Sequence, residues 1–149
     1  MSEVTEYIDN AQQSAAELAD RYVALWNEAD PERRRTLIAG LWSEQGEHIL
    51  QPPEEARRIA AGPGVGGSAI VEVRGHAEIE ARATSAYEQW VATEGWSFRH
   101  RDDADRVHDV VKFHWEAVAE DGEVTGSGLN LLVVAADGRI ERDYTFVDG

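Results

Sequence analysis

At 149 residues, with 42% hydrophobic residues, the chain is long enough to bury a core as one domain spanning residues 1–149. Its formal charge of −15 repels phosphate backbones and anionic lipid surfaces, so nucleic acid and membranes are not expected as partners. The absence of cysteine excludes disulfides and thiolate metal sites. The N-terminus has no apolar signal region and no stretch has the length of a membrane span, so we expect a cytoplasmic protein.

The first half of the chain is predicted to be mainly helical. Apolar residues recur at helical spacing over residues 14–28, whereas residues 1–13 are polar and are expected to be a flexible segment. Asp30 followed by Pro31 is typical of the N-cap and first position of a second helix, which is predicted to run toward Gly46.

The middle of the chain contains two short predicted strands and a third helix. Residues 47–51 predict a strand that the following two prolines end, and residues 69–74 predict another. Residues 52–68 contain a glycine-rich stretch and are predicted to form a loop or a lid. The third helix follows Gly75 and is expected to end at Gly95.

The last third alternates apolar and polar residues with period two, which predicts three or four consecutive strands. Asp-Gly pairs at 121–122 and 137–138 predict hairpin turns, with strands over 124–135 and 140–147. The preceding strand boundary stays open, because the turn could lie within 102–105 or at 108–109.

The strand before the first of these turns has two different faces. Phe113 and Trp115 are expected to line the interior, and His114 and Glu116 are expected to face solvent or a partner chain. If the register were reversed, His114 and Glu116 would instead become an internal acid–base pair.

Three N-terminal helices followed by an antiparallel meander predict an α+β fold, in which the helices pack on a strongly curved, mainly antiparallel sheet and enclose a pocket. The most specific segments of the chain are Arg-Tyr-Val-Ala-Leu-Trp-Asn at 21–27, the Leu41-Trp42 pair, and Asp-Gly-Arg-Ile at 137–140. In this order they resemble the NTF2-like superfamily, in particular its SnoaL-like and ketosteroid-isomerase-like branch. The resemblance implies a cone-shaped fold, a hydrophobic cavity, and often a homodimer formed through the outer face of the sheet.

The resemblance to the isomerases also implies site residues. Tyr22 matches the tyrosine that donates to a developing oxyanion, and Asn130 falls where those enzymes have a protonated aspartic acid. An amide can also donate such a hydrogen bond. The isomerase base is replaced here by Gln51, or by Leu50 if the register shifts, and neither takes a proton at neutral pH.

Two residues are candidates for the missing base. His48 lies two residues before Leu50 on the same predicted strand, and imidazole is suited to proton transfer near neutral pH. SnoaL-type cyclases place an acid–base aspartate late in the sheet, so the resemblance makes Asp148 the second candidate, with Asp143 as its alternative. Around these groups, the residues expected to contact a ligand are Trp26, Gln51, Trp115, Leu132 and Tyr144.

The composition of the site limits the ligand and the chemistry. Several tryptophans facing one cavity favour a flat, largely apolar ligand. Asn130 lies among leucines, where an amide costs several kcal/mol, as an order of magnitude, unless it is hydrogen-bonded. No histidine–carboxylate cluster has metal-ligand spacing, so neither a metal nor a cofactor is expected.

Three functions remain open on this basis. The first is a cofactor-free isomerase, cyclase or dehydratase for an apolar ketone- or polyketide-like substrate. The second is a noncatalytic ligand-binding or dimeric scaffold protein, which the missing aspartate before Pro52 favours. The third is a dimerisation module whose cavity is filled by its own tryptophans.

Overall fold

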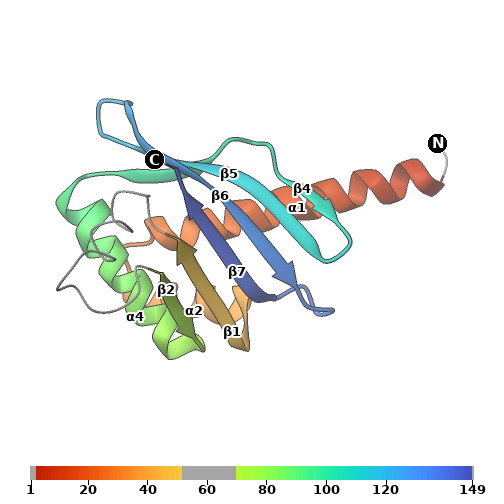
Figure 1. Cartoon of the computed structure of the whole chain (residues 1–149), viewed down its shortest axis with the longest axis horizontal. Coiled ribbons are helices and arrows are strands. Elements are labelled where there is room, and N and C mark those ends of the chain that lie inside the picture. The colour runs from red at the N-terminus through yellow and green to blue at the C-terminus, as the bar shows by residue number, and fades with distance from the viewer. Residues whose placement is uncertain (1–2, 52–69, 149) are drawn as a thin grey trace, which may run out of the picture.

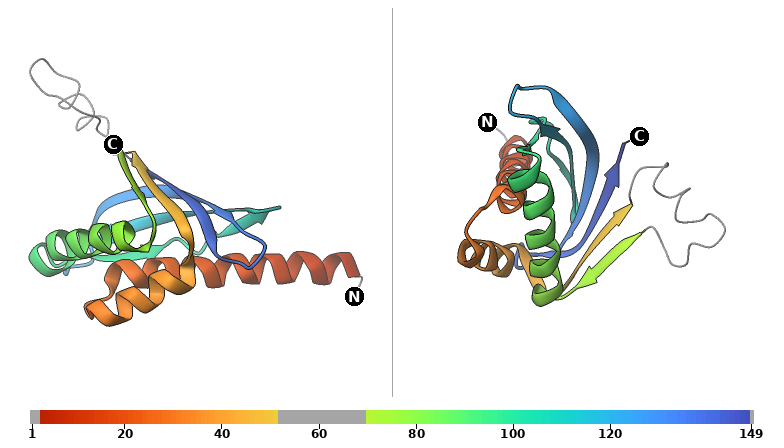
Figure 2. Two further views of the ribbon diagram at one scale, coloured as in Figure 1. Left: turned by 90° about the horizontal axis from the view of Figure 1, so that it is seen from below. Right: turned by 90° about the vertical axis from the view of Figure 1, so that its left-hand side faces the viewer.

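A computed structural model of the chain describes residues 3–51 and 70–148, with side chains from Ser14 onward. Helices cover one face of a single curved sheet, and the opposite face of that sheet carries no helix in the described part of the chain (Figure 1). Figure 2 shows how strongly the sheet bends around the helical layer. The predicted α+β cone is therefore confirmed. The predicted loop or lid at 52–68 lies outside the described residues.

The helical layer contains three α-helices. They are α1 (Glu3–Asn27), α2 (Pro31–Leu41) and α4 (His76–Ala86), and α4 continues directly into the π-helix η1 (Tyr87–Thr93). The Asp30 side chain accepts a hydrogen bond from the Glu32 N–H at 3.1 Å, which confirms the predicted N-cap of α2. Helix α1 begins earlier than residue 14, the predicted start. None of the described helices is both long enough and apolar enough to cross a membrane.

One mixed sheet contains all seven described strands. They are β1 (Trp42–Gln51), β2 (Val71–Arg74), β3 (Ser97–His100), β4 (Asp105–Val107), β5 (Val110–Val118), β6 (Val124–Val134) and β7 (Ile140–Val147). Their order is β2-β1-β7-β6-β5-β3, and β4 also pairs with β5. Every pairing is antiparallel except that of β1 with β7, which is parallel. The parallel pairing brings the first strand of the chain beside the last.

Two predicted boundaries are wrong. The first strand begins at Trp42 rather than at residue 47, because Trp42 already pairs with Ile140 and an irregularity in register follows before Glu47. This shift also ends α2 at Leu41 instead of near Gly46. At Gly46 an added Cβ would lie 2.7 Å from the Trp42 ring, so the irregular segment needs glycine here.

The last third forms five strands, β3 to β7, whereas three or four were predicted. Asp102 has a φ of 58°, which interrupts the extended backbone between β3 and β4. Both of these strands pair with β5. His108 has a φ of 55° and lies in the turn between β4 and β5. The sequence left two positions open for this turn, within 102–105 and at 108–109, and the strands are interrupted at both. The hairpin turns at Gly122 and Gly138 are confirmed, each with a positive φ.

The core lies between the helices and the concave face of the sheet. Phe113 and Val111 of β5 point into it and are fully buried, as the alternation predicted. Its other fully buried large residues are Leu25, Ile38, Leu41, Trp42, Ile79, Leu132 and Ile140.

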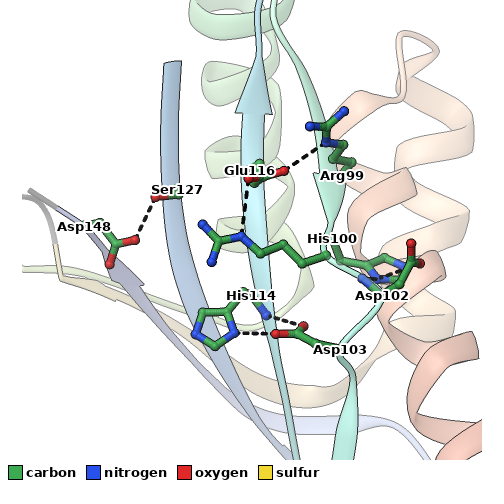
Figure 3. Close-up of polar contacts among 9 residues, drawn as sticks. Arg99, His100, Asp102, Asp103, His114, Glu116, Ser127 and Asp148 are labelled. Atoms are coloured by element: carbon green, nitrogen blue, oxygen red, sulfur yellow. Dashed lines mark hydrogen bonds and ion pairs between the residues drawn. The ribbon is translucent and has the colours of Figure 1, made fainter. Parts of the chain in front are cut away.

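The convex face of β5 carries polar pairs instead (Figure 3). His114 Nδ1 lies 2.5 Å from a carboxylate oxygen of Asp103, and Glu116 accepts a hydrogen bond from Arg99 at 3.0 Å. The reversed register, in which His114 and Glu116 form an internal acid–base pair, is therefore excluded.

Candidate functional site

A pocket of about 560 Å³ lies between the concave face of the sheet and the helices α1, α4 and η1. Its walls are mostly apolar. Four tryptophans contribute to them, and two of these, Trp90 and Trp96, stack with ring centroids 4.8 Å apart. The other lining residues named below are Tyr22, Trp26, His48, Arg82, Trp115, Asn130, Thr145 and Asp148. Flat apolar walls of this kind suit a flat, largely apolar ligand.

A buried carboxylate lies behind one wall of this pocket. Asp143 is on the concave face of β7 and is 0% exposed. The sheet register places His48 beside it on β1, and Thr145 follows two residues later on the same face. Asn130 of β6 is opposite Thr145, and Tyr22 reaches the group from α1.

Both oxygens of Asp143 are hydrogen-bonded. Oδ2 accepts from the Tyr22 hydroxyl at 2.5 Å and lies 2.7 Å from His48 Nδ1. Oδ1 accepts from Asn130 Nδ2 at 2.7 Å and from the Thr145 hydroxyl at 3.2 Å. A buried carboxylate with this many donors is held in one orientation, because losing any donor would leave charge uncompensated.

This arrangement determines the tautomer of His48. An ionised carboxylate only accepts hydrogen bonds, so the Nδ1 that faces Asp143 carries a proton. In the neutral ring, Nε2 is then the basic nitrogen. Among the described residues Nε2 has no hydrogen-bond partner. His48 is 1% exposed and borders the pocket beside Trp26, whose ring centroid is 5.2 Å away.

Tyr22 and Asn130 use their donors within the network. The Tyr22 hydroxyl donates to Asp143, and Asn130 Nδ2 lies within 2.9 Å of Tyr22, Asp143 and Thr145 oxygens. The contacts therefore differ from the predicted oxyanion site, since neither side chain has a donor left for a ligand. They orient Asp143, which in turn orients His48.

Burial raises the pKa of Tyr22 well above its usual value, and the negative charge of Asp143 adds to the effect. The folded chain holds this phenolic proton more tightly than the unfolded chain. The resulting stability is complete below the unfolded pKa of about 10 and is lost as the pH rises through the folded pKa. In an absorbance titration at 295 nm, we expect one native tyrosine to ionise later than the others. Ionisation of all tyrosines together near pH 10, or an unchanged curve for Tyr22→Phe, would contradict this.

The remaining predicted site residues have different positions. Trp26 and Trp115 line the pocket, as expected. Leu132 is in the core, Gln51 is at the end of β1 outside the pocket lining, and Tyr144 is on the convex face, where it accepts from Arg142. These three side chains are separated from the pocket by the alternation of the strands or by core packing.

Asp148 lies at the edge of the pocket, but its carboxylate accepts a hydrogen bond from Ser127 at 2.7 Å (Figure 3). It is exposed, and it follows the last residue of β7. The late aspartate that reaches the site is Asp143, which sequence reasoning named only as an alternative. Asp143 lies within β7, on its concave face, whereas Asp148 lies beyond the end of that strand.

The pocket also contains hydrogen-bonding groups without partners. Within the described part of the chain, Trp26 Nε1, Trp115 Nε1 and Arg82 Nε are buried and have no acceptor. Arg82 was not predicted, because an arginine inside an amphipathic helix usually belongs to the solvent face. No three His, Cys, Asp or Glu side chains of the described residues could together hold a metal ion.

Comparison with solved structures identifies the fold. The chain is similar to a proposed isomerase of the SnoaL-like family from Agrobacterium tumefaciens str. C58, with a TM-score of 0.73 and 24% identity, over 92% of this chain and 99% of that one. It is also similar to a SnoaL-like protein of unknown function from Burkholderia thailandensis E264, with a TM-score of 0.60 and 16% identity, over 93% and 97% of the two chains. A proposed polyketide cyclase from Sinorhizobium meliloti gives a TM-score of 0.55 at 10% identity, over 87% and 93%.

The protein thus has the NTF2-like fold in the form found in SnoaL-like proteins, which confirms the predicted resemblance. No family model and no curated protein matches the chain. At these identities the likeness establishes the fold, and the function has to be argued from the site.

Proposed function

We propose that this protein is a cofactor-free acid–base enzyme that isomerises, cyclises or dehydrates an apolar carbonyl compound in the pocket. The observation that carries the proposal is the buried His48–Asp143 pair at the wall of an apolar cavity. A histidine whose Nδ1 is fixed by a carboxylate, and whose Nε2 has no partner among the described residues, is arranged as a general base.

The chemical step follows from that arrangement. His48 Nε2 takes a proton from a carbon next to the substrate carbonyl, and the electrons of the C–H bond form an enolate. The imidazolium that results is stabilised by Asp143 at 2.7 Å. Return of the proton to a different carbon completes an isomerisation, and its transfer to a departing hydroxyl group completes a dehydration.

The pocket also supplies candidate donors for the enolate oxygen. Trp26 and Trp115 line it with indole N–H groups that have no acceptor among the described residues. An indole N–H can only donate a hydrogen bond, so it suits a carbonyl oxygen that becomes negative. These tryptophans take the role that the sequence assigned to Tyr22 and Asn130.

The proposal is tested by exchange of the substrate α-proton with solvent, an assay that does not require the product to be known. Purified protein is incubated in D₂O with a panel of enolisable aromatic and alicyclic ketones, and loss of the α-proton signals is followed by NMR. We expect exchange well above the buffer rate for at least one ketone class. Exchange at the buffer rate across the panel, with saturable binding of the same ketones, would favour a noncatalytic binding protein instead.

We also propose that two copies associate through the convex face of the sheet. Ile49, Leu129, Leu131, Tyr144 and Phe146 lie on this face, and Phe146 is 40% exposed. An uncovered apolar sheet face is a typical interaction surface.

Replacing Leu131 with glutamate is expected to weaken this dimer by about a hundredfold, because a charge would be buried at its centre. Analytical ultracentrifugation of the wild type and the variant measures the change. Val107→Glu is the control for an added charge, since Val107 is 75% exposed on β4, which is separated from β6 by β5. A wild type that stays monomeric at about 100 µM would contradict the dimer proposal, since obligate interfaces of this kind bind far more tightly.

A further inference from the structure

Arg82 is a charged residue that lines the pocket and has no counterion among the described residues. It lies on α4, and it lines the cavity together with Ala86 of the same helix and Gln89 and Trp90 of η1. Its Nε is buried without an acceptor, and no ion pair or hydrogen bond involves the side chain within residues 14–51 and 70–148. Burial lowers the pKa of the guanidinium, but arginine remains protonated at neutral pH.

This isolation is unusual in so acidic a chain. Each of the other described arginines has a side-chain hydrogen bond or an ion pair: Arg35 and Arg99 pair with carboxylates, and Arg34 donates to the Glu28 carbonyl. A partly buried cation without a partner costs free energy, and an anionic ligand bound in the pocket would offset that cost.

The other unpaired groups of the pocket agree with an acceptor-rich ligand. Trp26 Nε1 and Trp115 Nε1 are donors only, like the guanidinium of Arg82. His48 Nε2 is the one unpaired nitrogen among the described lining residues that can accept a proton. Three donor groups with apolar walls fit a molecule that has oxygen atoms at one end and a hydrophobic body.

We propose that the substrate is a small carboxylic acid with an apolar or aromatic body, and that Arg82 binds its carboxylate. This deepens the proposed function, on which it rests, because the same pocket holds the substrate for proton transfer at His48. The planar guanidinium can bind a carboxylate through two parallel hydrogen bonds. The net charge of −15 repels anions at long range, so the affinity for an acid must come from this local contact.

The test compares an acid with its uncharged isostere. Binding of 2-naphthoate and 2-naphthamide to the full chain is measured by isothermal titration calorimetry at neutral pH. Hydrogen bonds to a charged group correspond to a preference for the acid of roughly ten- to hundredfold. In Arg82→Gln we expect that preference to disappear through weaker naphthoate binding, with naphthamide binding nearly unchanged.

Arg33→Gln is the matched control, because it removes the same charge from a side chain that is 76% exposed on α2 and outside the pocket. It should retain the preference for the acid. Arg82→Lys keeps the charge and should retain part of it, which also covers the case in which Arg82→Gln folds poorly.

Equal binding of acid and amide by the wild type, or no acid binding at all, would overturn the carboxylate proposal. So would an Arg82→Gln variant that keeps the wild-type preference. These outcomes are distinguishable from a failure of the proposed function, which is measured separately by the exchange of ketone α-protons in D₂O.

Discussion

Replacing His48 with glutamine is expected to reduce α-proton exchange by roughly 10²- to 10⁴-fold, the usual contribution of a general base. Glutamine can still donate to Asp143 through its amide, so the network and the fold should persist. The rate of deuterium incorporation into a responsive ketone measures the effect, and thermal unfolding checks that the variant is folded.

His114→Gln provides the matched control. His114 also places its Nδ1 against an aspartate, Asp103, but it lies on the convex face and is outside the pocket. We expect its exchange rate to equal that of the wild type. An active His48→Gln variant, or an equal loss in both variants, would rule out His48 as the base.

Asp143→Asn should also lose exchange, for a different reason. One amide oxygen cannot accept from Tyr22, His48, Asn130 and Thr145 as two carboxylate oxygens do, so donors are left unpaired. Reduced stability by about 2 kcal/mol is therefore expected together with the loss of activity, whereas His48→Gln should lose activity alone.

Replacing Gly128 with alanine is expected to have the largest effect on stability. An added Cβ would lie 2.1 Å from the Phe146 carbonyl oxygen and 2.5 Å from the Trp115 ring. The oxygen belongs to the backbone of β7 and cannot rotate away, so we expect a loss of about 3 kcal/mol or more in the free energy of unfolding. For a domain of this size that corresponds to a midpoint roughly 6–12 °C lower in a thermal melt.

Gly126→Ala is the control for this change, because Gly126 lies two residues earlier on the same face of β6. Its added Cβ would meet only the Ala117 side chain, at 3.8 Å, which is an ordinary contact. We expect it to melt close to the wild type. In Gly128→Ala, the near-ultraviolet circular dichroism of the tryptophans should also change, since Trp115 has to move. Equal melting of the two variants would show that the close packing of Trp115 on β6 is not required.

The fold was largely predictable because its signals are local. Period-two alternation identified β6 and β7, the Asp-Gly pairs located their turns, and Asp30 located the start of α2. The start of β1 at Trp42 was not predictable in this way, because it depends on pairing with Ile140 near the other end of the chain.

The site was predictable only in part, because it also depends on pairing between strands that are far apart in the sequence. His48, Tyr22 and Asn130 were all identified, and all three contact one buried group. That group, Asp143, is joined to His48 by the parallel pairing of β1 with β7, which no local pattern reveals. The donors of Tyr22 and Asn130 were expected to face a ligand, but their geometry depends on where Asp143 lies. Arg82 gave no sequence signal, since its lack of a partner within residues 14–51 and 70–148 appears only once the helix is packed.

The protonation state of His48 tests the central claim most directly. A long-range ¹⁵N–¹H correlation spectrum at neutral pH distinguishes the two nitrogens of each imidazole, and the signals missing from His48→Gln assign this ring. We expect a protonated Nδ1 and an unprotonated Nε2 whose signal changes when 2-naphthoate is added. A proton on Nε2 with Nδ1 unprotonated, or a His48 signal that no pocket ligand changes, would contradict a general base positioned by Asp143.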